Sequence, residues 1–140
     1  ALGLSQLKKL DRFISRRRHI AHRYDEAFSS LKNVYRPQLA KKYSDQSGHH
    51  IYVLQFDLAK LGMSRTNIIK QLKTKNVGTQ VHYIPIYHQP YYARKNLFSA
   101  SHFPNTEKYY DGCLSIPLYP SMSDSDVTHV IHSIIEISGP

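Results

Sequence analysis

The segment from Gly78 to Tyr92 holds the side chains of this sequence that are best suited to chemistry. It carries two histidines and four tyrosines around the predicted end of a strand and a loop bounded by Pro85 and Pro90. Imidazole and phenol groups form hydrogen bonds with sugars and pyrophosphates, and a tyrosine ring offers a flat face to a nucleobase or a sugar. Loops hold functional groups more often than core strands do. Both a ligand-binding site and a packed aromatic cluster under the loop fit this composition.

The nine histidines raise the question of a metal site. His82 and His88 lie six residues apart, and His49 is adjacent to His50. A zinc site needs three or four ligands at recognisable spacing, and no carboxylate or thiolate motif accompanies these pairs. We therefore expect no metal site. Four further histidines are expected on solvated helix faces: His19, His22, His129 and His132.

The formal net charge of +9, from 19 Lys and Arg against 10 Asp and Glu, favours an anionic partner. Nucleic acid, an acidic membrane surface and a phosphorylated metabolite all fit this charge. The run Arg16–Arg18 could contact phosphate, although a solvated or inter-subunit helix face is the simpler interpretation. The basic residues concentrate on one predicted helix instead of alternating with aromatic residues, and no nucleic-acid motif appears. We therefore expect no nucleic-acid partner.

Cys113 is the only cysteine, so the chain cannot form an internal disulfide or a thiolate metal site. It lies in an apolar context and is expected to be buried and inert. A reducing cytosol is the simple explanation for this cysteine usage. No apolar run approaches the ~18–20 residues that span a bilayer, and no secretory leader pattern opens the sequence. We therefore expect a cytoplasmic protein with no membrane partner.

Helices and strands alternate along the sequence and must position the segment 78–92. Apolar residues recur at helical spacing over residues 2–31, which predicts one long helix that bridges two bodies. A polar loop is expected over residues 32–48. The remaining segments are expected to form strands over 51–58, 78–84 and 114–120, and helices over 64–76, 105–113 and from 123 onward.

These elements predict a single α/β (α+β) domain over residues 1–140. It would consist of a linking helix over residues 1–31 and a small α/β unit over residues 49–140. The sheet is expected to be three-stranded, mostly antiparallel and packed with helices.

Three segments resemble the DegT-type (DegT/StrS) family of pyridoxal-phosphate-dependent sugar-nucleotide aminotransferases. Residues 1–11 are similar to the segment that follows the last conserved stretch of that family's large domain. Residues 78–92 resemble its substrate-facing strand and loop, and residues 115–124 resemble its closing motif. The resemblance covers the whole chain, in order, as the small C-terminal domain of a fold-type-I aminotransferase. Its nearest likeness is to the transaminases of the pseudaminic acid pathway.

The resemblance implies a homodimeric enzyme that transfers an amino group from glutamate to a nucleotide-linked 4-keto-6-deoxy sugar. It implies that His82, Tyr83 and His88 line the nucleotide-sugar side of the cleft. The family's Schiff-base lysine and the residues that hold pyridoxal phosphate lie upstream, in the large domain. Lysines of this chain such as Lys70 and Lys95 match no such motif. We therefore expect no catalytic residue, no bound cofactor and no transamination by this chain alone.

Two origins of this chain remain open. A nucleic-acid-binding module is a third, less favoured alternative. The chain could be a detached C-terminal fragment, or a separately expressed subunit that reassembles with a large-domain partner. Without the large domain, an apolar strip on the helix 2–31 would lack its cover. We therefore expect a homo-oligomer that forms through this helix.

Overall fold

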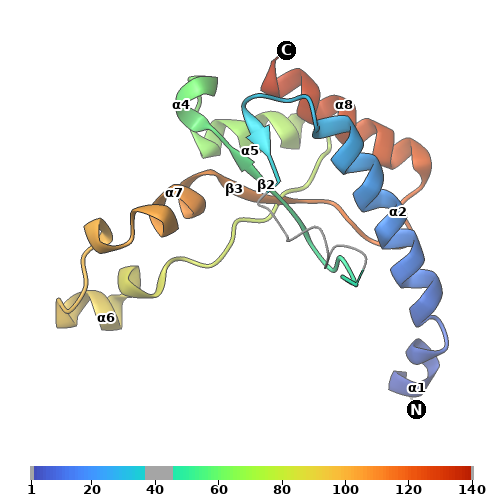
Figure 1. The fold of residues 1–140 in the computed structure, drawn as a ribbon, viewed down its shortest axis with the longest axis horizontal. Coiled ribbons are helices and arrows are strands. Elements are labelled where there is room, and N and C mark those ends of the chain that lie inside the picture. Colours follow the sequence, from blue (N-terminus) through green and yellow to red (C-terminus); the bar gives the residue numbers. More distant parts are fainter. Residues whose placement is uncertain (1, 37–45, 140) are drawn as a thin grey trace.

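The sheet of this protein has three antiparallel strands in the order β1–β2–β3. The structure, a computed structural model, describes residues 2–36 and 46–139. The strands are β1 (Val34–Tyr35), β2 (Tyr52–Phe56) and β3 (Cys113–Ile116). Helices cover one face of this sheet, and an arm that carries helix α6 (Pro90–Lys95) projects from the main body (Figure 1). The predicted class, helices packed on a three-stranded antiparallel sheet, is confirmed.

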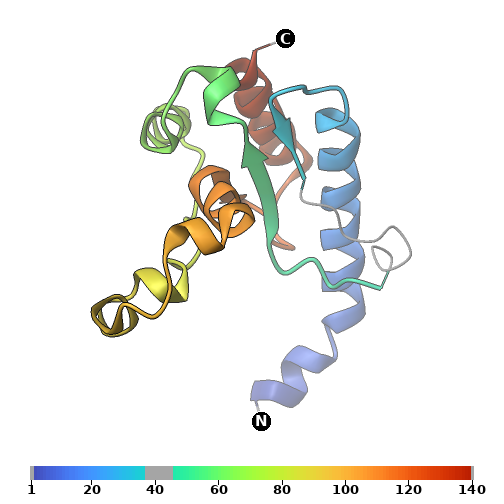
Figure 2. The ribbon, with the colours of Figure 1, turned by 60° about the vertical axis from the view of Figure 1, so that its left-hand side comes forward.

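The core lies between the sheet and two long helices, α2 (Leu10–Phe28) and α8 (Asp124–Ser138). These helices run side by side in both ribbon views (Figures 1 and 2). Helix α5 (Arg65–Thr74) packs beside α8 and begins with the Ser64 side chain accepting from the Asn67 N–H. The largest fully buried side chains come from all of these layers: Tyr24, Tyr52, Phe56, Ile20, Leu54, Ile68, Leu72, Leu114 and Ile134.

The opposite face of the sheet is only partly covered. Val53 pairs with Ser115, and Gln55 pairs with Cys113, so alternation places these four side chains on one face. Helix α7 (Pro104–Gly112) packs on β2 and covers the Gln55 end. Val53 and Ser115 are only half-buried, so their end of the sheet is open to solvent.

The predicted continuous helix over residues 2–31 is broken near its start. Helix α1 (Leu2–Leu7) stops at a turn in which the Lys9 N–H donates to the Gln6 carbonyl oxygen at 2.9 Å. This bond to the third preceding residue tightens the chain into a turn before α2 begins. Helix α2 ends at Phe28, where the Ser29 N–H closes a similar turn on Glu26.

The predicted strand over residues 78–84 is not formed. Gln80 alone bridges Ser115, on the outer edge of β3. Continued pairing would need backbone donors two residues to either side of Ser115. Pro117 has no N–H, and the Cys113 N–H already donates to the carbonyl oxygen of Tyr109. The edge of β3 therefore offers this segment a single pairing position.

The third strand comes instead from a segment predicted as loop. Val34 pairs with Phe56, which sets the two residues of β1 beside β2. Residues 37–45 of that predicted loop lie outside the described residues. The remaining short elements are α4 (Leu58–Leu61), η1 (Ile86–His88), α6 (Pro90–Lys95) and η2 (Ala100–His102).

Candidate functional site

The predicted site residues lie on a segment, residues 80–88, that we call the strap. The strap starts at Gln80, on the edge of β3, and ends in η1, at the base of the arm that carries α6 (Figure 1). Pro85 is buried, whereas Ile84 and Ile86 on either side of it are exposed. The strap is thus fixed at its start and its middle and presents side chains between these points.

His82 is held against the sheet. Its Nε2 lies 2.9 Å from the Oγ of Ser115, within hydrogen-bond distance. Its ring meets the Tyr109 ring edge-on, with centroids 6.3 Å apart. His82 also lines a cleft of about 510 Å³ beside the open end of the sheet. The cleft is lined by His50, Ile51, Gln80, Val81, His82, Tyr83, Ile84, Gln89 and Ser115.

Tyr83 lies on the same cleft with its side chain 98% exposed. A tyrosine ring this exposed gains nothing from packing within its own chain, so it is free to stack on a ligand or a partner. The structure therefore brings His82 and Tyr83 together on one cleft.

His88 does not line that cleft. Its Nε2 lies 2.7 Å from Glu107 Oε1, and the Tyr87 hydroxyl donates to the same oxygen at 2.6 Å. The Tyr87 ring stacks on Phe103 with centroids 4.8 Å apart. We call Tyr87, His88 and Glu107 the clasp, since they tie the end of the strap to α7.

Hydrogen bonding and burial shift the pKa values of two members of the clasp, Glu107 and Tyr87. The Tyr87 hydrogen bond, assisted by His88, holds the pKa of Glu107 below its ordinary value. Burial, together with the Glu107 hydrogen bond, raises the pKa of Tyr87 to about 12. Near neutral pH, Glu107 is therefore an ionised acceptor and Tyr87 a protonated donor.

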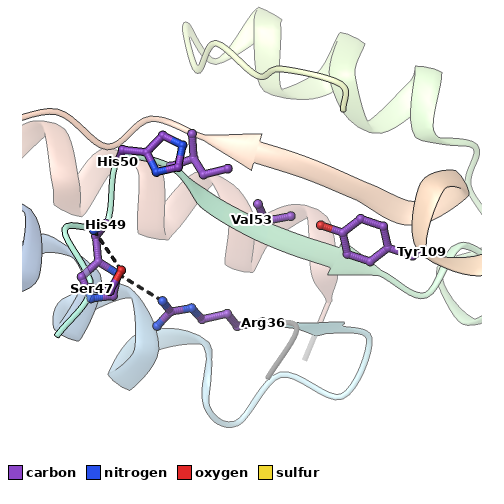
Figure 3. A pocket seen from close by; sticks show the side chains of 7 residues that line it. Arg36, Ser47, His49, His50, Val53 and Tyr109 are labelled. Atoms are coloured by element: carbon purple, nitrogen blue, oxygen red, sulfur yellow. Dashed lines mark hydrogen bonds between the residues drawn. The ribbon is translucent and has the colours of Figure 1, made fainter. Parts of the chain in front are cut away.

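A second cavity of about 260 Å³ adjoins the cleft and shares His50 and Ile51 with it. Figure 3 shows its side chains set along β2, with His50 and Tyr109 toward opposite ends of the strand and Val53 between them. Arg36 donates to both carboxylate oxygens of Asp25, at 2.8 and 2.9 Å. This bidentate pair holds the guanidinium at the wall of the cavity.

Sequence reasoning missed several members of the site. Ser115 was expected in a strand and in the segment that resembles the family's closing motif, and Glu107 in a helix, but neither was expected as a site residue. Their roles depend on residues 33 and 19 positions away, respectively. No local pattern in the sequence connects such partners.

The Arg16–Arg18 run serves the fold. Arg16 donates to the Met122 carbonyl oxygen at 2.6 Å and pairs with Asp124 at 2.8 Å. Arg18 donates to the carbonyl oxygen of Ser47. Two of the three arginines thus bind groups of their own chain, and all three are half-buried, so the run is not the solvated face that the sequence suggested.

Cys113 is fully buried, as its context predicted. Burial raises the pKa of its thiol, which keeps it protonated. Among residues 2–36 and 46–139, no three His, Cys, Asp or Glu side chains gather closely enough to hold a metal ion. No helix in the same part of the chain is long and apolar enough to span a bilayer.

The described residues do not fit pyridoxal phosphate. A Schiff-base lysine needs a sheltered amine whose pKa burial or a neighbouring cation can lower. Of the lysines that the structure describes, all are exposed except Lys75, which pairs with Glu136 at 2.7 Å. None of these lysines lines the cleft.

Comparison with known proteins gives consistent matches. The chain is 44% identical over 140 residues to the spore coat polysaccharide biosynthesis protein SpsC of Bacillus subtilis, covering 98% of this chain and 35% of SpsC. It superposes on Helicobacter pylori PseC, an aminotransferase involved in the biosynthesis of pseudaminic acid, with a TM-score of 0.82 and 27% identity. That match covers 98% of this chain and 36% of PseC.

The putative sugar aminotransferase Spr1654 of Streptococcus pneumoniae, solved in its PLP form, superposes with a TM-score of 0.83. The identity is 25%, and the match covers 98% of this chain and 34% of Spr1654. The chain thus spans about a third of the length of these relatives. Residues 1–135 match the model of one family along almost the whole chain. The chain therefore belongs to the DegT/DnrJ/EryC1/StrS aminotransferase family.

Proposed function

We propose that this chain supplies the nucleotide-sugar-facing small domain of a pyridoxal-phosphate-dependent sugar aminotransferase. The complete enzyme would transfer an amino group from glutamate to a nucleotide-linked 4-keto-6-deoxy sugar. In this proposal His82 and Tyr83 contact the substrate directly, and His88 anchors the strap that presents them. The lysine that forms the Schiff base would come from another part of the enzyme.

The observation that supports this proposal is the cleft at the open end of the sheet. It combines an imidazole held by Ser115, a nearly fully exposed phenol ring at Tyr83 and the amide side chains of Gln80 and Gln89. A hydrogen-bonding imidazole and an aromatic face suit the hydroxyls, phosphates and flat base of a nucleotide sugar. The net charge of +9 favours the negatively charged pyrophosphate.

Titration of the 140-residue chain with UDP-N-acetylglucosamine, followed by amide NMR, tests the substrate side. We expect shifts of the amides lining the cleft, and about a fivefold weaker Kd in His82→Ala, which is the cost of one hydrogen bond. His132→Ala, exposed on α8, is the control and should bind like the wild type. Equal affinity of His82→Ala and wild type would remove His82 from the proposed site.

The cofactor side has its own test. We expect that adding pyridoxal phosphate, reducing with borohydride and measuring the intact mass gives no stoichiometric adduct on one lysine. The reason is that the described lysines are exposed or, at Lys75, paired with Glu136, and all of them lie off the cleft. A single stoichiometric adduct would show that the chain holds a cofactor pocket and would overturn this part of the proposal.

We also propose that the chain associates through α1 and the first turns of α2. Leu2, Leu4, Leu7 and Leu10 are 76%, 70%, 61% and 45% exposed, respectively. An apolar strip of this kind marks a surface that another protein surface covers. A second copy of the chain is the occupant that we propose for the 140-residue chain in solution.

A further inference from the structure

Ser115 connects the strap to the sheet through its backbone and through its side chain. Its N–H donates to the Gln80 carbonyl oxygen at 2.9 Å, and its carbonyl oxygen accepts from the Gln80 N–H at 3.1 Å. Its Oγ lies 2.9 Å from Nε2 of His82, two residues further along the strap. One residue thus fixes both the path of the strap and the ring that the strap presents.

The backbone of Ser115 is held on both sides, which makes its hydroxyl a well-defined anchor. On the inner side, β3 pairs with β2 from Cys113 to Ile116. On the outer side, the Gln80 bridge completes the hydrogen bonds of Ser115. A functional group carried by a paired strand is held more precisely than one carried by a loop.

The two nitrogens of the His82 ring are in different situations. Nε2 is within hydrogen-bond distance of Ser115, whereas Nδ1 forms no hydrogen bond among residues 2–36 and 46–139. Since His82 lines the cleft, Nδ1 is the nitrogen left for a ligand. A hydrogen bond at one imidazole nitrogen holds the orientation of the ring and therefore the direction in which the other nitrogen points.

We propose that Ser115 is the positioning residue of the site, which holds the orientation of the His82 ring so that Nδ1 meets the nucleotide sugar. The inference rests on the proposed function, because it assigns His82 to the substrate side. Tyr109 touches the ring by an edge-to-face contact, which restrains the plane of the ring but distinguishes neither nitrogen. Without the Ser115 hydroxyl, the described residues leave the His82 ring with no hydrogen bond.

The experiment uses the 140-residue chain labelled with ¹⁵N in its histidine rings. The Nε2 shift of His82, which reports its hydrogen bond, should differ between the wild type and Ser115→Ala. Ser115→Thr keeps a hydroxyl on the same Cβ and should restore the wild-type shift. Ser15→Ala, exposed on α2, is the control. The Kd for UDP-N-acetylglucosamine should weaken about fivefold in Ser115→Ala and recover in Ser115→Thr.

The outcomes separate this inference from the proposed function. Unchanged ring shifts of His82 in Ser115→Ala would overturn the positioning role, even if the wild type binds the probe. Failure of the wild type to bind the probe would overturn the proposed function, while the ring shifts would still decide whether Ser115 holds the His82 ring. The amide signal of Gln80 reports whether the bridge survives. If the bridge is lost in Ser115→Ala, lack of recovery in Ser115→Thr would overturn the positioning role.

Discussion

Glu107 shows how a single carboxylate can organise a segment that has little burial of its own. It accepts from Tyr87 and lies within hydrogen-bond distance of His88, both through Oε1. The phenol and the imidazole on the strap therefore share one acceptor on α7. This one carboxylate therefore joins the end of the strap to α7 through two side chains.

Replacing Glu107 by Gln should lower the pKa of Tyr87 from about 12. The amide is a weaker acceptor and carries no charge, so it opposes phenol ionisation less. The pKa should stay above the ordinary 10.0, because burial is the larger cause of the shift. A titration of the Tyr87 ¹³Cζ signal measures it. Glu136→Gln, which removes a carboxylate bonded to Lys75, should leave Tyr87 unchanged.

The clasp should open in acid. The pKa of Glu107 is depressed in the folded chain, so its stabilising contribution is present above the ordinary value of 4.5 and is lost as pH falls through the folded pKa. Amide hydrogen exchange at His88, whose N–H donates to the Pro85 carbonyl oxygen, should therefore speed up relative to the α8 core below pH 4.5. Constant relative protection across that range would contradict this mechanism.

At the scale of elements, the junction between α7 and β3 tolerates no side chain. A Cβ at Gly112 would overlap the Phe56 carbonyl oxygen and lie 2.6 Å from Gln55 Nε2. Gly112→Ala should therefore lower the free energy of unfolding by about 2 kcal/mol or more, because the backbone of β2 must move. Gly78→Ala is the control, since a Cβ there meets nothing within 4 Å. Chemical denaturation measures both, and equal stabilities would contradict the prediction.

The start of α8 depends on a reciprocal cap. The Ser123 Oγ accepts from the Asp126 N–H at 3.1 Å, and the Asp126 carboxylate accepts from the Ser123 N–H at 2.8 Å. Ser123→Ala should lower the free energy of unfolding by about 1 kcal/mol. His132→Ala, exposed in the middle of the same helix, should change it by less than about 0.5 kcal/mol. A cap variant as stable as the wild type would show that the packing of α8 alone fixes its start.

The sequence was most informative where local chemistry decides the structure. The predicted helices over residues 64–76 and from 123 onward are present, and a serine side chain, Ser64 or Ser123, caps the start of each. The sequence was least informative where the pairing of strands decides the structure. Residues 81–84 favour a strand by composition, but Pro117 and the engaged N–H of Cys113 leave them no partner. Val34 and Tyr35 pair with β2 although their surroundings are polar.

The candidate site follows the same division. Its rings could be predicted because their residue types are unusual for one short segment. The separation of His82 from His88 could not, since it depends on Ser115 and Glu107 in distant elements. The resemblance to a family implied that these residues line one cleft, but it did not specify the contacts that each side chain makes.

At the scale of the whole molecule, a run of exposed leucines, from Leu2 to Leu10, lies at the N-terminal end of the described chain. Helix α1 has no buried residue, and the first buried residue of α2 is Ile20. If a second copy covers this strip, Leu4→Gln combined with Leu7→Gln should shift the chain from an oligomer to a monomer in sedimentation equilibrium. Leu97→Gln, 64% exposed on the arm, is the control and should leave the mass unchanged. A wild type that is monomeric at high concentration would contradict the proposal.

The packing of α2 against α8 affects how the chain folds during its synthesis on the ribosome. The two helices are separated by about a hundred residues of chain, yet they cover each other in the finished core. The part of α2 that α8 covers therefore stays exposed until nearly all of the later segments have been translated. Long-range contacts of this kind slow folding and expose apolar surface to aggregation and chaperones in the interval.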